Sequence, residues 1–255
     1  MAGHSIGRPG PAAHNRRMNK LLVATCFILL GTIGQATAAA ADPAPSARTI
    51  VLVRHGHYAP DPAADARLGP ALSPLGVAQA RLAGARLGAM PISFDSLYVS
   101  PLQRAKDTAA SISIDFPGRS FAVIDGLEEC TPPTRRTEIT RDEKAEDLAR
   151  CKTQLDRLFE QHFKPAAERE QTDMMVCHGN VIRYLITRAL GVDTSAWLEM
   201  SVRHASITVI RVEADGRFKV ISAGDSGHIP ANMSSGATGD PDRSLAVPIL
   251  PVASK

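Results

Sequence analysis

The sequence predicts an α/β fold of three layers, in which helices cover both faces of a mostly parallel β-sheet. Runs with the pattern of buried strands alternate along the chain with segments of helical periodicity, as in folds of this class. Of the 255 residues, 44% are hydrophobic but only 4% are aromatic, so the core must be aliphatic. The 19 Gly and 18 Pro indicate a chain that turns often. This length is sufficient for one sizeable core or two small ones.

Six segments have the pattern of strands, and four have the pattern of helices. Residues 49–53 form a continuous run of mainly β-branched side chains, as expected for a strand buried on both faces. Two helices follow a Ser-Pro pair, Ser73–Pro74 and Ser100–Pro101, in which Ser is expected as the N-cap and Pro as the first helical residue. The expected strands are 49–53, 96–99, 121–124, 174–177, 206–212 and 218–222, of which the last two form a hairpin. The expected helices are 74–87, 102–114, 141–163 and 181–190.

The N-terminal segment, residues 1–41, has the composition of a targeting signal. Its charged side chains are all basic: Arg8, Arg16, Arg17 and Lys20. An apolar run over 21–33 and small residues up to position 41 follow, as in a signal peptide before its cleavage site. We therefore expect export, to the periplasm or as a secreted protein. The alternative is an uncleaved N-terminal membrane anchor, because residues 21–41 carry no charge over a length that could just span a bilayer.

The remaining chain divides into a linker, one folded domain and a tail. Residues 42–48 are expected as a linker, residues 49–228 as the folded domain, and residues 229–255, which are rich in Pro, Ser, Gly and Ala, as a flexible tail. Without the basic leader the formal charge of +3 falls to near zero, which argues against nucleic-acid binding. Membrane contact is expected only if the leader stays uncleaved, and a homodimer is left open.

Charged side chains follow the expected strands of the parallel sheet. Arg54 and His55 follow the first strand, Arg104 lies beyond the second, Glu128–Glu129 follows the third and His178 the fourth. Because ligands bind beyond the carboxyl ends of such strands, we expect these groups to converge. Guanidinium groups match phosphoryl oxygens, a neutral imidazole can attack phosphorus, and a carboxylic acid can protonate the leaving oxygen. The sequence therefore predicts a phosphoryl-transfer site.

Two His and one Glu could also bind a metal ion. Catalytic zinc sites use three such protein ligands. Two arginines beside the ion would, however, repel it. We therefore expect neither a metal nor any other cofactor.

Four segments in chain order resemble the motifs of the histidine phosphatase superfamily, whose fold is phosphoglycerate mutase-like. They are Leu52–Gly56, Leu72–Ala80, Ser100–Ala105 and Cys177–Arg183. The resemblance covers about residues 48–230. Within the superfamily, the chain is most similar to the mitochondrial serine/threonine protein phosphatases, which implies the same three-layer α/β/α fold.

The resemblance implies a role for five residues. His55 would be the nucleophile that forms a phosphohistidine, and Glu129 would be the proton donor. The phosphoryl oxygens would be held by Arg54, Arg104 and His178, the last of which would also take part in catalysis. The implied activity is hydrolysis of phosphate monoesters on a phosphorylated small molecule or a phosphoprotein.

Some positions leave alternatives open. Glu128 is the alternative proton donor, because the alignment with the family motif could slip by one residue. His57 and Tyr58 depart from the first motif of the mutases, which makes a mutase-type phosphoryl transferase the less favoured alternative. A catalytically inactive binding protein of the same fold is the other alternative.

Three further departures bear on the substrate. Cys130 stands where the similar phosphatases usually have Gly, and Arg203–His204 replaces a pair of Asn, so the substrate preference is open. His57 and His204 match no family role, and we expect them in loops or at the rim of the site.

The four cysteines allow one disulfide that the sequence does not decide. Cys26 lies in the leader, and Cys177 ends a buried apolar strand, where a buried thiol is expected. Cys130 and Cys151 can be bridged in an oxidising compartment or remain free, and both alternatives are open.

Overall fold

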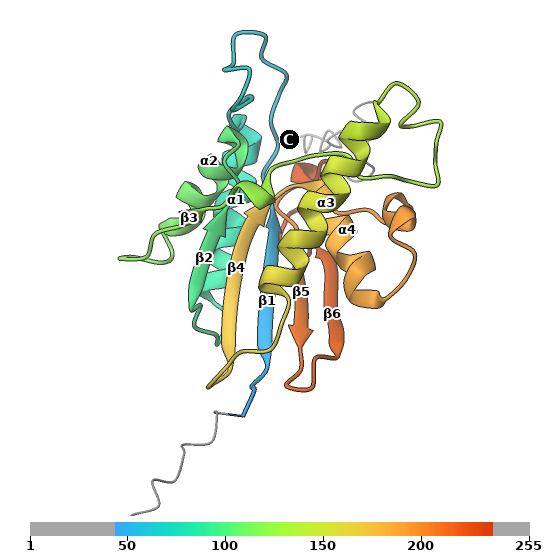
Figure 1. Ribbon diagram of the computed structural model, residues 1–255. Coiled ribbons are helices and arrows are strands. Elements are labelled where there is room, and N and C mark those ends of the chain that lie inside the picture. The colour runs from blue at the N-terminus through green and yellow to red at the C-terminus, as the bar shows by residue number, and fades with distance from the viewer. Residues whose placement is uncertain (1–43, 237–255) are drawn as a thin grey trace, which may run out of the picture. The chain divides into compact units, whose positions relative to one another are not determined.

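The computed structural model describes residues 44–236, whose strands form one six-stranded sheet (Figure 1). The strands are β1 (Arg48–Arg54), β2 (Ser96–Val99), β3 (Ala122–Val123), β4 (Gln171–Cys177), β5 (Ile207–Val212) and β6 (Phe218–Asp225). Their order across the sheet is β3-β2-β4-β1-β5-β6. The strands from β3 to β1 are parallel, whereas β5 runs antiparallel to both β1 and β6. The prediction of a mostly parallel sheet is confirmed.

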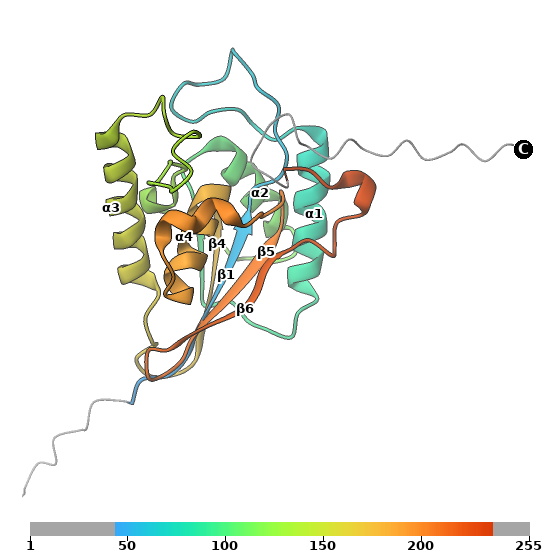
Figure 2. The same cartoon turned by 90° about the vertical axis from the view of Figure 1, so that its right-hand side faces the viewer.

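Four α-helices cover the two faces of this sheet. They are α1 (Pro74–Gly88), α2 (Gln103–Ser113), α3 (Ala145–His162) and α4 (Gly179–Leu190). Helices α1 and α2 pack on one face, and α3 and α4 pack on the other (Figures 1 and 2), so the predicted three layers are confirmed. Short 3-10 helices lie in the connecting segments: η1 (Asp125–Leu127), η2 (Thr194–Glu199) and η3 (Ala231–Met233). Among the described residues, none of the helices is both long and apolar enough to cross a membrane.

The apolar run of β1 is buried on both faces because it contributes to two cores. Ile50 and Leu52 pack with the apolar side chains of α3 and α4. Val51 and Val53 point to the opposite face and pack with those of α1 and α2. Alternate residues of a strand point to opposite faces, so a strand at the centre of three layers must be apolar at every position. The carboxyl end of β1 is therefore packed from both faces of the sheet.

The two Ser-Pro pairs behave differently. Ser73 is the N-cap of α1, where its Oγ accepts the Gly76 N–H at 3.2 Å, and Pro74 is the first helical residue, as predicted. The second expectation is wrong, because α2 begins only at Gln103 and has no side-chain cap. The hydroxyl of Ser100 instead lies 2.7 Å from Nε2 of His178. A contact made at the site therefore replaces the local cap.

The ends of the predicted domain need correction. Helix α3 begins at Ala145 rather than 141, and β3 is only two residues long. The segment 229–236, expected as the start of the flexible tail, packs on the domain, and its Ser234 and Ser235 are buried. Long-range hydrogen bonds of these residues hold the segment, and such polar pairs leave no periodic signal in a sequence. The leader and residues 237–255 lie outside the described residues.

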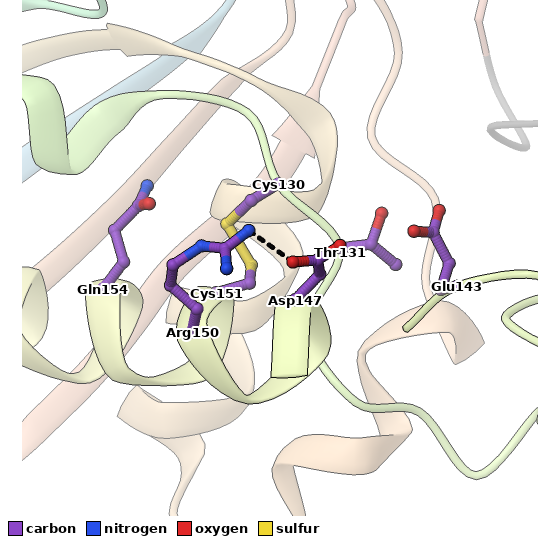
Figure 3. Close-up of a pocket in the computed structure, with 7 residues that line it drawn as sticks. All are labelled: Cys130, Thr131, Glu143, Asp147, Arg150, Cys151 and Gln154. Atoms are coloured by element: carbon purple, nitrogen blue, oxygen red, sulfur yellow. Dashed lines mark hydrogen bonds and ion pairs between the residues drawn. A yellow bond between two sulfur atoms is a disulfide. The ribbon is translucent and has the colours of Figure 1, made fainter. Parts of the chain in front are cut away.

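A disulfide joins Cys130 to Cys151, so the bridged alternative is confirmed. It connects the loop that follows η1 to the second turn of α3 (Figure 3). Cys177 is a buried free thiol, as expected, and burial raises its pKa. Gln154 of α3 donates hydrogen bonds to the carbonyls of Gly126 and Glu128, at 3.2 and 2.9 Å. The loop that carries the two glutamates is thus held to α3 by covalent and polar contacts.

A pocket of about 260 Å³ lies beside this disulfide. Its lining residues come from the same loop and from α3 with the segment before it: Cys130, Thr131, Glu143, Asp147, Arg150, Cys151 and Gln154. Arg150 donates to the carboxylate of Asp147, three residues earlier in α3, at 2.5 Å (Figure 3). The charge of that arginine is therefore already partly neutralised.

The disulfide should contribute to stability. Replacing Cys130 and Cys151 together with serine should lower the free energy of unfolding by roughly 3 kcal/mol, because the bridge closes a loop of about 20 residues in the unfolded chain. Urea unfolding with and without a dithiol reductant measures this difference. Alkylation of the denatured, unreduced protein followed by peptide mapping is the control, and it should modify Cys177 but neither bridged cysteine. Alkylation of all three would contradict the bridge.

Candidate active site

The site lies at the carboxyl ends of β1 and β4, which are adjacent in the sheet. Their register pairs Arg54 with Cys177, so the next residues, His55 and His178, emerge side by side. The two rings lie 5.0 Å apart between centroids, and both side chains are buried. The backbone N–H of His55 donates to the Cys177 carbonyl at 2.9 Å. The parallel pairing therefore positions both histidines at one edge of the sheet, as the sequence predicts.

The hydrogen bond at Nδ1 sets the protonation of His55. Nδ1 lies 2.8 Å from the Gly56 carbonyl oxygen, which can only accept, so this nitrogen carries the proton and Nε2 keeps its lone pair. Arg104 Nε donates toward that Nε2 at 3.3 Å. Burial, reinforced by His178 and by Arg54, holds the pKa of His55 well below its ordinary value. The ring is therefore neutral at physiological pH.

Close packing after β1 requires two glycines. A Cβ on Gly56 would lie 2.4 Å from the Gly76 carbonyl oxygen, and one on Gly76 would lie 2.0 Å from the His57 carbonyl oxygen. The start of α1 can therefore approach the His55 loop only because neither residue has a side chain. Thr108 of α2 accepts the Gly56 N–H at 3.0 Å and holds the loop from the other side.

Two arginines supply positive charge beside His55. Arg104 is buried on α2, and its guanidinium lies over the ring of Tyr58, 4.9 Å from the centroid. Arg54 donates from Nη1 to the carbonyls of Val202 and Gly236, at 2.6 and 2.7 Å. Burial lowers the pKa of Arg54 to about 10, so it stays cationic at neutral pH. Its Nε has no hydrogen-bond partner among the described residues.

Of the two adjacent glutamates, Glu129 has contacts from its carboxylate to groups of the site. Oε1 of Glu129 accepts the Asn180 N–H at 3.1 Å, and Oε2 lies 3.8 Å from Nδ1 of His178. Burial raises the pKa of the Glu129 carboxyl, and Arg54 opposes that shift. The Glu129 side chain keeps 24% of its surface exposed, which leaves room for a reactant. Glu128 contributes its backbone carbonyl, which accepts from Gln154.

Two residues at the site were not given a role from the sequence. His204, expected at the rim, is only 8% exposed, and its ring centroid lies 5.3 Å from that of His55. The backbone N–H of Ala205 donates to the His55 carbonyl at 3.1 Å and brings this loop onto β1. Tyr58 packs edge-on against His55, at 5.4 Å. The one hint in the sequence was the departure from Asn at position 204.

Three side chains of the site are also of the types that bind metal ions. Ligand atoms of His55, Glu129 and His178 lie within 4.8 Å of one another. However, Arg104 donates toward the Nε2 lone pair that His55 would offer to a cation. A guanidinium at this position repels a cation and attracts an anion. The electrostatics of the site therefore favour a phosphoryl group over a metal ion.

Two curated relatives show what the chain is similar to. The protein called "Serine/threonine-protein phosphatase Pgam5, mitochondrial" of Drosophila grimshawi is 34% identical over 194 residues, which cover 73% of this chain and 66% of that protein. The protein of the same name from Caenorhabditis elegans is 34% identical over 198 residues, covering 75% of this chain and 68% of that protein. The matching part thus spans about two thirds of the length of these relatives.

These relatives contradict the expected localisation. Export to the periplasm or secretion was predicted from the leader, but the relatives are described as mitochondrial proteins, so the prediction of export is wrong. The reason is chemical: a basic segment without acidic residues is typical of mitochondrial targeting segments as well as of signal peptides. The pattern therefore could not discriminate between these destinations.

The family is shown by two further comparisons. Residues 50–225 match the model of the histidine phosphatase superfamily, branch 1. The crystal structure of a phosphoglycerate mutase from Plasmodium falciparum has a TM-score of 0.51 and 25% sequence identity, over 73% of this chain and 96% of that one. With the fold and four motifs in agreement, the chain belongs to the histidine phosphatase superfamily.

Proposed function

We propose that the protein is a phosphatase that hydrolyses phosphate monoesters through a phosphohistidine on Nε2 of His55. The observation that carries this proposal is the state of His55: a neutral, buried ring whose Nδ1–H is held by the Gly56 carbonyl and whose Nε2 lone pair faces the guanidinium of Arg104. A neutral imidazole is a nucleophile, and a guanidinium beside it attracts the phosphoryl anion.

The reaction has two steps that use the same groups. First, Nε2 of His55 attacks phosphorus, the ester P–O bond breaks, and the Glu129 carboxylic acid gives its proton to the leaving oxygen. The phosphoryl oxygens are held by Arg54, Arg104 and His178. Water then attacks phosphorus, the Glu129 carboxylate takes a proton from it, and the N–P bond breaks. Inorganic phosphate leaves, and His55 is again neutral.

We propose phosphoserine and phosphothreonine side chains as substrates. The relatives that support this proposal are named serine/threonine-protein phosphatases. The names of these relatives favour hydrolysis over transfer to a second hydroxyl.

A substrate panel tests the activity. Release of inorganic phosphate should be measured with phosphoserine and phosphothreonine peptides and, in parallel, with sugar phosphates. The peptides should have the higher kcat/KM. Transfer of the phosphoryl group to a second hydroxyl of a sugar phosphate, without release of phosphate, would contradict hydrolysis.

Chelators should not affect turnover. No step of the proposed mechanism uses a metal ion, so dialysis against EDTA should leave kcat within twofold of its starting value. Added zinc should inhibit, because it would compete with the phosphoryl group for His55 and His178. Loss of activity on chelation, with recovery on adding zinc, would contradict the metal-free mechanism.

A further inference from the structure

The loop that carries His204 adopts a strained backbone. Ala205 has φ of 54°, and it is the non-glycine residue with positive φ among residues 44–236. Its N–H donates to the His55 carbonyl at 3.1 Å, and its own carbonyl oxygen lies 3.0 Å from Nε2 of His228. A left-handed alanine costs free energy, and such residues persist where the surroundings force them, often at functional sites. Here the strain places His204 against the nucleophile.

A chain of hydrogen bonds determines which nitrogen of His204 carries the proton. The His57 backbone N–H donates to Oε1 of Gln79 at 2.8 Å, so the amide nitrogen of Gln79 points the other way. That nitrogen donates to Oγ of Ser235 at 2.9 Å and to the Met233 carbonyl. Among the described residues, Nδ1 of His204, 3.0 Å away, is then the acceptor available to the proton of the Ser235 hydroxyl. The proton of the neutral ring is therefore on Nε2.

His178 is held in the same way. The Leu102 N–H donates to Oγ of Ser100 at 3.3 Å, and that hydroxyl lies 2.7 Å from Nε2 of His178. Among the described residues, Nε2 of His178 is the acceptor available to the serine proton, so we assign that proton to this bond and an N–H to Nδ1. Two serines therefore hold two histidines, each with its free N–H on the nitrogen remote from the serine.

Each of these two histidines, and Arg54, keeps one side-chain nitrogen without a partner within residues 44–236. Nδ1 of His178, Nε2 of His204 and Nε of Arg54 are all buried and have no hydrogen-bond partner among the described residues. The rings of both histidines lie near His55, at 5.0 and 5.3 Å. Burial, with Arg54, lowers the pKa of His204 to about 2, so the ring stays neutral and keeps one N–H. Buried donors without partners beside two guanidinium groups match the oxygens of a phosphoryl group.

We infer that His204 is a further phosphoryl ligand whose Nε2–H donates to a phosphoryl oxygen, and that Ser235 is a positioning residue that sets its tautomer. This inference rests on the proposed phosphatase function. In the sheet, β1, which precedes His55, lies between β4 and β5. His178 follows β4 and His204 precedes β5, so the two donors reach His55 from opposite sides. The inference also extends the site to segment 229–236, which contributes Ser235.

Binding of inorganic phosphate to the full chain tests the ligand role by calorimetry. His204→Phe should weaken binding by about 10- to 100-fold, the loss expected for a hydrogen bond to a charged group. His204→Asn, which keeps an N–H donor, should recover part of that loss. Ser235→Ala should weaken binding by about 2- to 10-fold. Ser234→Ala is the matched control, because this neighbouring hydroxyl binds Arg203 instead, and it should bind like wild type.

The tautomer can be observed without any variant. In ¹⁵N NMR of the wild-type histidine side chains, His204 should be protonated at Nε2 and not at Nδ1, and its Nε2–H signal should shift when phosphate is added. A proton on Nδ1, or equal affinities of His204→Phe and wild type for phosphate, would overturn the inference about His204. Neither result would contradict the proposed phosphatase function. A wild-type chain that binds phosphate but hydrolyses no phosphate monoester would instead contradict the proposed function.

Discussion

His55→Ala is expected to reduce hydrolysis of phosphate monoesters by about 10⁴-fold or more, because the variant has no atom that can accept the phosphoryl group. The fold should survive. The imidazole bonds only to the carbonyl of the next residue and to Arg104, while the backbone bonds of position 55 to Cys177 and Ala205 are independent of the side chain. Phosphate release and the thermal midpoint Tm, measured on one preparation, separate activity from folding.

A control histidine makes this result specific. His162 is a half-buried residue at the end of α3 that packs against Tyr98, with 5.2 Å between ring centroids. His162→Ala should therefore keep wild-type turnover even if its Tm falls. Turnover in His55→Ala close to that of wild type would show that another residue is the nucleophile.

Glu129→Gln should separate substrates by their leaving groups. If Glu129 protonates the leaving oxygen, strongly basic serine or sugar alkoxides need it, whereas a weakly basic aryl oxide does not. Hydrolysis of alkyl phosphates should fall by about 10²- to 10⁴-fold, or on the order of 3 to 6 kcal/mol in barrier. An aryl phosphate should still give a burst of phenol followed by slow turnover, because the same carboxylate activates the incoming water.

The dependence of kcat on pH should show that the protonated form of Glu129 is the active one. Because burial raises the pKa of Glu129, the acid stays protonated to higher pH than an ordinary glutamate. In wild type, kcat for alkyl phosphates should fall as pH rises through that pKa, and Glu129→Gln should lose this limb. Glu128→Gln is the matched control and should behave like wild type. A leaving-group dependence that appears in Glu128→Gln instead would exchange the two roles.

Local patterns predicted the parts of the fold that depend on neighbouring residues. The run 49–53 predicted a strand buried on both faces, and Ser73–Pro74 predicted the start of a helix. Ser73 caps that helix although the ring of His57 also lies 2.8 Å from its hydroxyl. Ser100 failed as a cap because its hydroxyl binds His178, a residue 78 positions away. A contact with a distant residue can therefore accompany a local cap, as at Ser73, or replace it, as at Ser100.

The site likewise contains residues whose positions the sequence predicts and others whose positions depend on distant contacts. His55 and His178 could be brought together from the sequence, because parallel strands end at one edge of a sheet. His204 could not, since its approach depends on the Ala205 bond to His55 and on the buried Ser235. The disulfide was likewise undecided, because bridging depends on the 5.6 Å between the Cα atoms of Cys130 and Cys151. Contacts between residues far apart in the sequence leave no periodic pattern, so they become visible only in the structure.

Trapping the covalent intermediate tests the central claim most directly. The protein should be mixed rapidly with an aryl phosphate, quenched at alkaline pH, at which phosphohistidine survives, and mapped by mass spectrometry and NMR of the modified peptide. We predict one phosphoryl group per chain, on Nε2 of His55, because Nδ1 is engaged by the Gly56 carbonyl. A phosphoryl group on Nδ1 or on another residue, or hydrolysis with no phosphoenzyme at any quench time, would contradict the account.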